Sequence, residues 1–153
     1  DLVAALTPGS GGYLESAVAL SGEVAVRVLD ARAQAELPAA ELAALIARAA
    51  GARLTALTQA LEDGEHPVPA RVARAFLRLG SRFGQSLADG TVRLTLPVTH
   101  DTLAAMVGAA RETTTAVVAD LRRLGLLEGT RGSYRMRPAE LTEYALEATL
   151  DAR

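Results

Sequence analysis

The chain has 153 residues, of which 50% are hydrophobic and only 3% aromatic, so any core must be built from aliphatic side chains. It contains no cysteine, which excludes disulfides and cysteine-ligated zinc or iron–sulfur clusters. No apolar run approaches the roughly 18 residues that a membrane span needs, and the first residues lack the basic start and apolar stretch of a signal peptide. We therefore expect a cytoplasmic protein with no membrane partner.

The formal net charge of −2 hides an uneven distribution of charge. Residues 66–137 carry eleven arginines and five acids, whereas residues 1–65 carry four arginines and nine acids, and residues 138–153 carry one arginine and four acids. Every basic residue is an arginine, whose guanidinium group stays charged and binds phosphate bidentately. A basic segment between acidic ends is typical of a module that meets a polyanion.

The first predicted elements are short. The Pro-Gly-Ser-Gly-Gly run at residues 8–12 predicts a turn. Val24–Leu29 alternates and is rich in valine, which predicts a strand, and the weaker alternation of Arg32–Leu37 predicts a second one.

A long helix is predicted from Ala39 to about Leu61, opened by Pro38 and containing one glycine. One apolar stripe follows the helical period, with three leucines beside it (Leu54, Leu57, Leu61). So little chain precedes this helix that a second copy of it is the natural partner, with packing inside the same chain as the alternative. We therefore expect residues 38–64 to form a dimerisation helix, with contacts made by Leu42, Leu45, Ile46, Ala49, Ala52 and Ala56.

Residues 62–67 are expected to break this helix and to mark a domain boundary. A helix from about Pro69 to Phe83 follows, with Val72, Phe76 and Leu79 facing inward. Residues 84–90 are predicted as a loop, and Val92–Leu96 alternates as a strand.

Two helices joined by a glycine turn come next. Thr99 is a good N-cap for a helix over His100–Val107, and Gly108 ends that helix where the chain needs a positive φ. A second helix is predicted over Ala110–Leu124. This arrangement predicts a helix-turn-helix.

A β-hairpin is predicted after the helix pair. Its strands are Gly125–Glu128 and Ser133–Met136, separated by a turn at 129–132. Together with Val92–Leu96, the hairpin makes a small sheet beside the helices, which predicts a winged helix. An acidic helix over Ala139–Leu150 forms a C-terminal extension within residues 138–153.

The segment LPVTHDTLAAMVGAARETTTAVVADLRRLGLLEGTRGSYRM resembles the DNA-binding domain of the Crp/Fnr superfamily, the cyclic AMP receptor protein group. The triplet Arg111-Glu112-Thr113 matches the recognition signature of that family, and the resemblance covers about residues 67–137. It implies a mainly α (α+β) fold with a long dimerisation helix before a winged helix-turn-helix. It also implies a DNA-binding transcription regulator that binds a palindromic site as a homodimer, with helix 110–124 in the major groove.

The resemblance assigns base readout to the start of this recognition helix. Arg111 can donate two hydrogen bonds to guanine, and Glu112 can accept one from cytosine. Thr113 and Thr115 are short side chains suited to a phosphate or a thymine methyl group. Family members often carry another basic residue where this chain has Ala116, so the DNA site that it reads is expected to be altered or relaxed.

Phosphate contacts are expected from Thr99 and His100 at the start of the first helix, and from Arg131 on the wing. For Arg131 a solvated loop residue is the alternative. A winged helix that binds protein rather than DNA is the alternative function, and RNA polymerase is a further candidate partner. An enzyme is not expected, because the sequence has no nucleophile–base pair, no metal cluster and no phosphate loop with its lysine.

The segment YLESAVALSGEVAV at residues 13–26 resembles the cyclic-nucleotide cassette of the family's β-roll sensor. Glu15 and Ala17 fit the cassette, but Glu23 and Val24 stand where it has an arginine and a small hydroxyl residue. A carboxylate at that position repels a cyclic phosphate. We therefore interpret residues 1–37 as a remnant of the sensor and expect no cofactor.

Overall fold

The computed structural model describes residues 19, 23–26, 29–130 and 132–152, in two compact units, Asp1–Gln59 and Ala60–Arg153. The predicted turn at 8–12, most of the cassette-like segment and Arg131 lie outside the described residues. The division of the chain into a sensor remnant, a dimerisation helix, a winged helix and an extension stays a prediction.

The first unit holds a short helix where the alternation predicted a strand. Helix α1 spans Ala31–Glu36, so the strand predicted over Arg32–Leu37 is wrong. Its alternating residues are alanine, arginine, glutamine and glutamate, which favour helix, and Asp30 caps it by accepting a hydrogen bond from the Ala33 amide at 2.8 Å. Glu23–Val26 form no strand either, which contradicts the described part of the strand predicted over Val24–Leu29.

Helix α2 (Ala39–Gly64) begins where the sequence predicted and continues three residues further. Several of its large apolar side chains are exposed, among them Ile46, Leu54 and Leu57. Of the predicted dimerisation residues, three are half-buried (Leu42, Leu45, Ala49) and three are exposed (Ile46, Ala52, Ala56). The helix therefore presents apolar surface that the described chain leaves in contact with water.

The end of α2 belongs to the second unit and is fixed there by a buried acid. Asp63 is only 6% exposed. Its carboxylate accepts a hydrogen bond from Arg74 Nε at 2.7 Å and forms an ion pair with Arg78. Both arginines lie on helix α3 (Val68–Phe83), so the two helices are tied together where the sequence predicted only a break.

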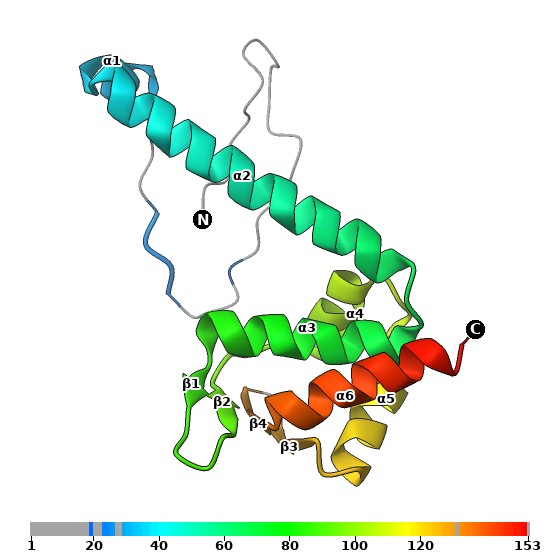
Figure 1. Ribbon diagram of the computed structural model, residues 1–153. Coiled ribbons are helices and arrows are strands. Elements are labelled where there is room, and N and C mark those ends of the chain that lie inside the picture. Colours follow the sequence, from blue (N-terminus) through cyan, green and yellow to red (C-terminus); the bar gives the residue numbers. More distant parts are fainter. Residues whose placement is uncertain (1–18, 20–22, 27–28, 131, 153) are drawn as a thin grey trace. The chain divides into compact units, whose positions relative to one another are not determined.

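The core of the second unit forms around α3. Val72, Phe76 and Leu79 are buried, as predicted. Helix α6 (Pro138–Leu150) lies alongside α3 and buries Leu141 and Ala145 against the unit (Figure 1).

Four short antiparallel strands form one sheet in the order β1-β2-β4-β3: β1 (Gln85–Ser86), β2 (Val92–Leu94), β3 (Leu127–Thr130) and β4 (Ser133–Met136). The sheet joins the core through the ring of Tyr134, which meets that of Phe76 edge-on with 5.2 Å between centroids. Strand β1 was predicted as loop, β2 is shorter than predicted, and β3 begins later and runs on to Thr130. The predicted mainly α class with a small sheet is confirmed.

Helices α4 (His100–Val107) and α5 (Arg111–Arg123) are the predicted helix pair, with α5 one residue shorter at each end. Gly108 joins them with φ 61° and ψ 47°, a left-handed conformation that disfavours residues with a Cβ. Within the described part of the chain, no helix combines the length and apolar character that crossing a membrane requires.

Candidate nucleic-acid interface

The first turn of α4 is capped by Thr99. Its Oγ1 accepts a hydrogen bond from the Thr102 amide at 3.0 Å and lies 2.9 Å from Thr102 Oγ1. The other free amides of a first helical turn, with the positive end of the helix dipole, attract anions. This geometry makes the start of α4 suitable for a phosphate, as the sequence predicted.

His100, the next residue, connects α4 to α5. Its Nδ1 lies 3.0 Å from Oγ1 of Thr115 in the second turn of α5. The structure therefore joins two of the predicted DNA-contacting side chains directly.

Arg111 opens α5 and faces the start of α4. Its Nη1 lies 3.5 Å from Oδ1 of Asp101, and both side chains are 65% exposed. Glu112 and Thr113 follow on the same turn and are exposed. The start of α5 is thus exposed to solvent.

A cleft of about 290 Å³ gathers these elements. It is lined by Thr99, His100, Asp101, Arg111, Arg122 and Thr130. Three predicted site residues therefore meet in one hollow, whereas the predicted Glu112, Thr113 and Thr115 are not among its lining residues.

Sequence reasoning did not select three residues that line this cleft. Asp101 had a local signal, because it is an acid in the first turn of a capped helix. Arg122 lies in the last turn of α5, with its guanidinium carbon 6.0 Å from the centre of the Tyr134 ring. Thr130 ends β3 beside the wing turn, and only the folded hairpin brings it to the helices.

Arg71 binds the turn between α4 and α5 by hydrogen bonds to its carbonyl oxygens. This residue of α3 donates from Nη1 to the carbonyl oxygens of Val107 at 2.8 Å and Gly108 at 3.3 Å. The last carbonyls of a helix have no partner within it, and a cation there also suits the helix dipole. Arg71 therefore fixes the corner between α4 and α5.

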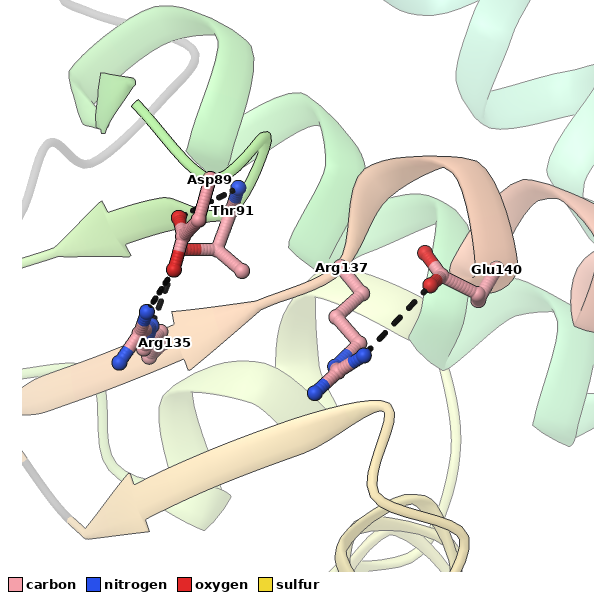
Figure 2. A network of polar contacts seen from close by, with 5 residues as sticks. All are labelled: Asp89, Thr91, Arg135, Arg137 and Glu140. Atoms are coloured by element: carbon pink, nitrogen blue, oxygen red, sulfur yellow. Dashed lines mark hydrogen bonds and ion pairs between the residues drawn. The ribbon is translucent and has the colours of Figure 1, made fainter. Parts of the chain in front are cut away.

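A polar network stabilises the base of the wing sheet (Figure 2). Asp89 Oδ1 accepts hydrogen bonds from the amide and the hydroxyl of Thr91, at 3.1 and 2.6 Å, and the carboxylate pairs with Arg135 on β4. These bonds from Thr91, and then the charge of Arg135, hold the pKa of Asp89 below its ordinary value of 3.8.

The same network borders a second hollow of about 240 Å³, whose lining includes Arg135 and Arg137. Arg137 lies 3.8 Å from Glu140 in the first turn of α6. Two acids and two arginines line this hollow, whereas one acid and two arginines line the cleft beside α5, so this hollow attracts an anion less. No group of His, Cys, Asp and Glu suited to a metal ion occurs among the residues that the structure describes.

The capped helix α4, its left-handed glycine turn into α5 and the antiparallel hairpin beside the two helices define a winged helix-turn-helix domain. Residues 70–144 match the family model of the Crp-like helix-turn-helix domain. The chain is 41% identical over 58 residues to the CRP-like cAMP-activated global transcriptional regulator of Mycobacterium tuberculosis, a match covering 38% of this chain and 25% of that protein.

Two solved transcriptional regulators of Thermus thermophilus have a similar structure. One, of the CRP/FNR family, has 30% identity and a TM-score of 0.60, over 74% of this chain and 58% of that one. The other, of the CRP family, has 26% identity and a TM-score of 0.59, over 75% of this chain and 58% of that one.

Residues 70–144 therefore match a Crp-like helix-turn-helix domain, and the chain shows homology to CRP-like regulators and to Crp/Fnr structures. This confirms the family resemblance seen in the sequence. The matched segment spans a quarter of the length of its mycobacterial relative.

Proposed function

We propose that this chain is a sequence-specific DNA-binding transcription regulator that reads a palindromic site as a homodimer. The observation that carries the proposal is the cleft that brings the capped start of α4, Arg111 at the start of α5 and the wing strand β3 to one place. Winged helices use these three elements to meet a phosphate, a base edge and the flanking backbone, respectively.

Arg111 and Glu112 are the proposed base-reading pair. Both are exposed in the first turn of α5, and the buried side of that helix faces the core through Thr114, Val117 and Val118. An exposed guanidinium group at a recognition-helix start can donate to O6 and N7 of guanine, while a carboxylate can accept from N4 of cytosine. Thr113 and Thr115 are proposed to add contacts beside this pair.

Thr99 and His100 are the proposed phosphate anchors, and Arg131 is proposed as another on the wing. The support for the first two is their place at the start of α4 and in the cleft. Binding should weaken steeply with salt, because each neutralised phosphate releases counterions.

The homodimer is proposed from α2. Leu54 is 67% exposed and Leu57 53% exposed, on a helix of 26 residues. Apolar side chains repeated along one long helix are buried most simply against the same helix of a second copy. A two-fold dimer then reads two inverted half-sites about one helical turn apart.

Selection of bound sequences from a random duplex pool tests the whole proposal. The parent protein should enrich a palindrome with a G·C pair in each half-site. Arg111→Ala should lose discrimination at one G·C pair while keeping weak binding to random DNA. Arg123→Ala, which removes an arginine from the other end of the same helix, is the matched control and should leave the selected sequence unchanged.

Three outcomes would contradict parts of the proposal. Equal specificity of Arg111→Ala and parent would remove Arg111 as the reading residue. A selected site without two-fold symmetry, or a monomer in sedimentation equilibrium, would exclude the dimer. If the parent failed to bind random duplex even at low salt, the domain would be a protein-interaction module instead.

We also propose that the chain binds no cyclic nucleotide. The support is Glu23 and Val24 at the positions where the family's cassette has an arginine and a small hydroxyl residue. A calorimetric titration with cyclic AMP should give no binding heat. Saturable binding would contradict this proposal without affecting the DNA-reading one.

A further inference from the structure

We infer that Asp101 is a specificity-determining residue of the recognition helix. Its carboxylate orients Arg111 and opposes contact of that arginine with phosphate, so that Arg111 favours base edges. The inference rests on the proposed function and assigns a role to an acid within an otherwise cationic cleft.

The backbone positions of Asp101 and Arg111 hold their two side chains close together. Asp101 lies in the first turn of α4, and Arg111 is the first residue of α5. The bond between His100 and Thr115 holds the same two helix starts together, and Gly108 fixes the turn that separates them. The 3.5 Å between Asp101 Oδ1 and Arg111 Nη1 is therefore supported by neighbouring contacts, and does not depend on two flexible side chains alone.

Asp101 differs in charge from the other ionised side chains that line the cleft. Among the described residues that line it, Arg111 and Arg122 are cationic and Asp101 is the single carboxylate. A phosphate that approaches Arg111 must also approach Asp101 and is repelled by it. The O6 and N7 atoms of guanine are neutral acceptors, so they gain the hydrogen bonds of Arg111 without that like-charge repulsion.

The ion pair is weak enough to permit binding. Exposed ion pairs contribute little to stability, so Arg111 can leave Asp101 when a guanine edge arrives. The carboxylate then remains near the bound arginine, and it lowers the affinity for any DNA on which Arg111 meets only phosphate. Asp101 thus acts by weakening non-specific binding more than specific binding.

The test compares the parent with Asp101→Asn, which keeps the size of the side chain and removes its charge. Affinities for a random duplex and for the sequence selected by the parent are measured by fluorescence anisotropy at several salt concentrations. Binding to the random duplex should tighten about two- to fivefold, the range that exposed ion pairs span. Binding to the selected site should tighten less, so the specificity ratio falls, and the salt slope for random DNA should steepen by up to about 0.9.

Asp120→Asn is the matched control. It makes the same change of charge and releases Arg123 at the other end of α5. It should alter the specificity ratio much less than Asp101→Asn does. Asp101→Asn should also have little effect in an Arg111→Ala background, because the arginine through which it acts is gone.

An unchanged or increased specificity ratio in Asp101→Asn would overturn the inference. So would an equal change in Asp120→Asn, because that would show an effect of net charge alone. Both results require a parent that binds DNA. A parent that binds no duplex contradicts the proposed function itself, and the inference with it. Thermal melts should show both variants folded, since both replaced side chains are exposed.

Discussion

Nδ1 of His100 lies 3.0 Å from Oγ1 of Thr115, so the first residue of α4 is joined to the second turn of α5 across 15 residues of chain. Both residues were selected from the sequence as DNA contacts, each for its own position. The structure shows that they are also contacts of each other. A substitution of either residue should therefore change the angle between α4 and α5 as well as the affinity for DNA.

Thr115→Val removes this hydroxyl while keeping the branched shape. We expect the free energy of unfolding to fall by no more than about 1 kcal/mol, because the hydrogen bond is exposed. Urea denaturation measures the loss. Thr113→Val is the control, since Thr113 is an exposed threonine in the preceding turn of the same helix without a bond to α4, and the unfolding free energy of this variant should stay closer to that of the parent. An equal loss in both variants would show that the His100 bond does not stabilise the helix pair.

Arg71→Met should destabilise the second unit through the corner between α4 and α5. The variant keeps a long side chain but leaves the carbonyls of Val107 and Gly108 without their cationic donor. Hydrogen bonds to charged groups contribute about 1.5–3 kcal/mol, and we expect a loss in that range by chemical denaturation. Arg123→Met, at an exposed residue, should change stability much less. Similar losses in the two variants would remove the capping role of Arg71.

Gly129→Ala and Gly132→Ala should separate backbone strain from steric conflict in the wing. Both glycines have positive φ, 90° and 95°, so alanine is strained at either. A Cβ at Gly129 would also collide with the carbonyl oxygen of Ser133, whereas a Cβ at Gly132 meets nothing within 4 Å. We expect Gly129→Ala to lower the thermal midpoint clearly more than Gly132→Ala does. Equal midpoints would mean that the hairpin relaxes around the clash.

Asp89→Asn should change how stability depends on pH. The pKa of Asp89 is lowered in the folded state, mainly by hydrogen bonds from Thr91. A lowered folded-state pKa contributes stability that is fully present above the ordinary value of 3.8 and is lost as the pH falls through the lowered value. The melting temperatures of parent and variant should therefore differ at pH 7 and converge below about pH 4. A difference that persists unchanged into acid would contradict the role of the Asp89 charge.

The helix pair could be predicted from the sequence because its signals are local. Thr99 as N-cap and Gly108 at the turn give the bounds of α4 without reference to the rest of the chain. The apolar period of α3 likewise identified its large buried side chains, Val72, Phe76 and Leu79.

Other features depend on partners distant in sequence. Strand β1 exists because Gln85 and Ser86 pair with β2, and nothing in their own composition favours a strand. The capping by Arg71 joins residues 36 and 37 positions apart, so no spacing rule could reveal it. At α1 the local helix propensity and the Asp30 cap outweigh the alternation of the side chains.

The pairing of Asp63 with Arg74 and Arg78 couples the unfolding of the end of α2 to that of α3, and it limits where the chain can be cut into fragments. The last turn of α2 should open cooperatively with α3, and its amide hydrogens should exchange with the solvent at rates set by the second unit. A fragment starting at residue 67 would lack the carboxylate that Arg74 and Arg78 share. A fragment meant to keep the second unit intact should therefore begin within α2, ahead of Asp63, and not at the residues that follow the end of this helix.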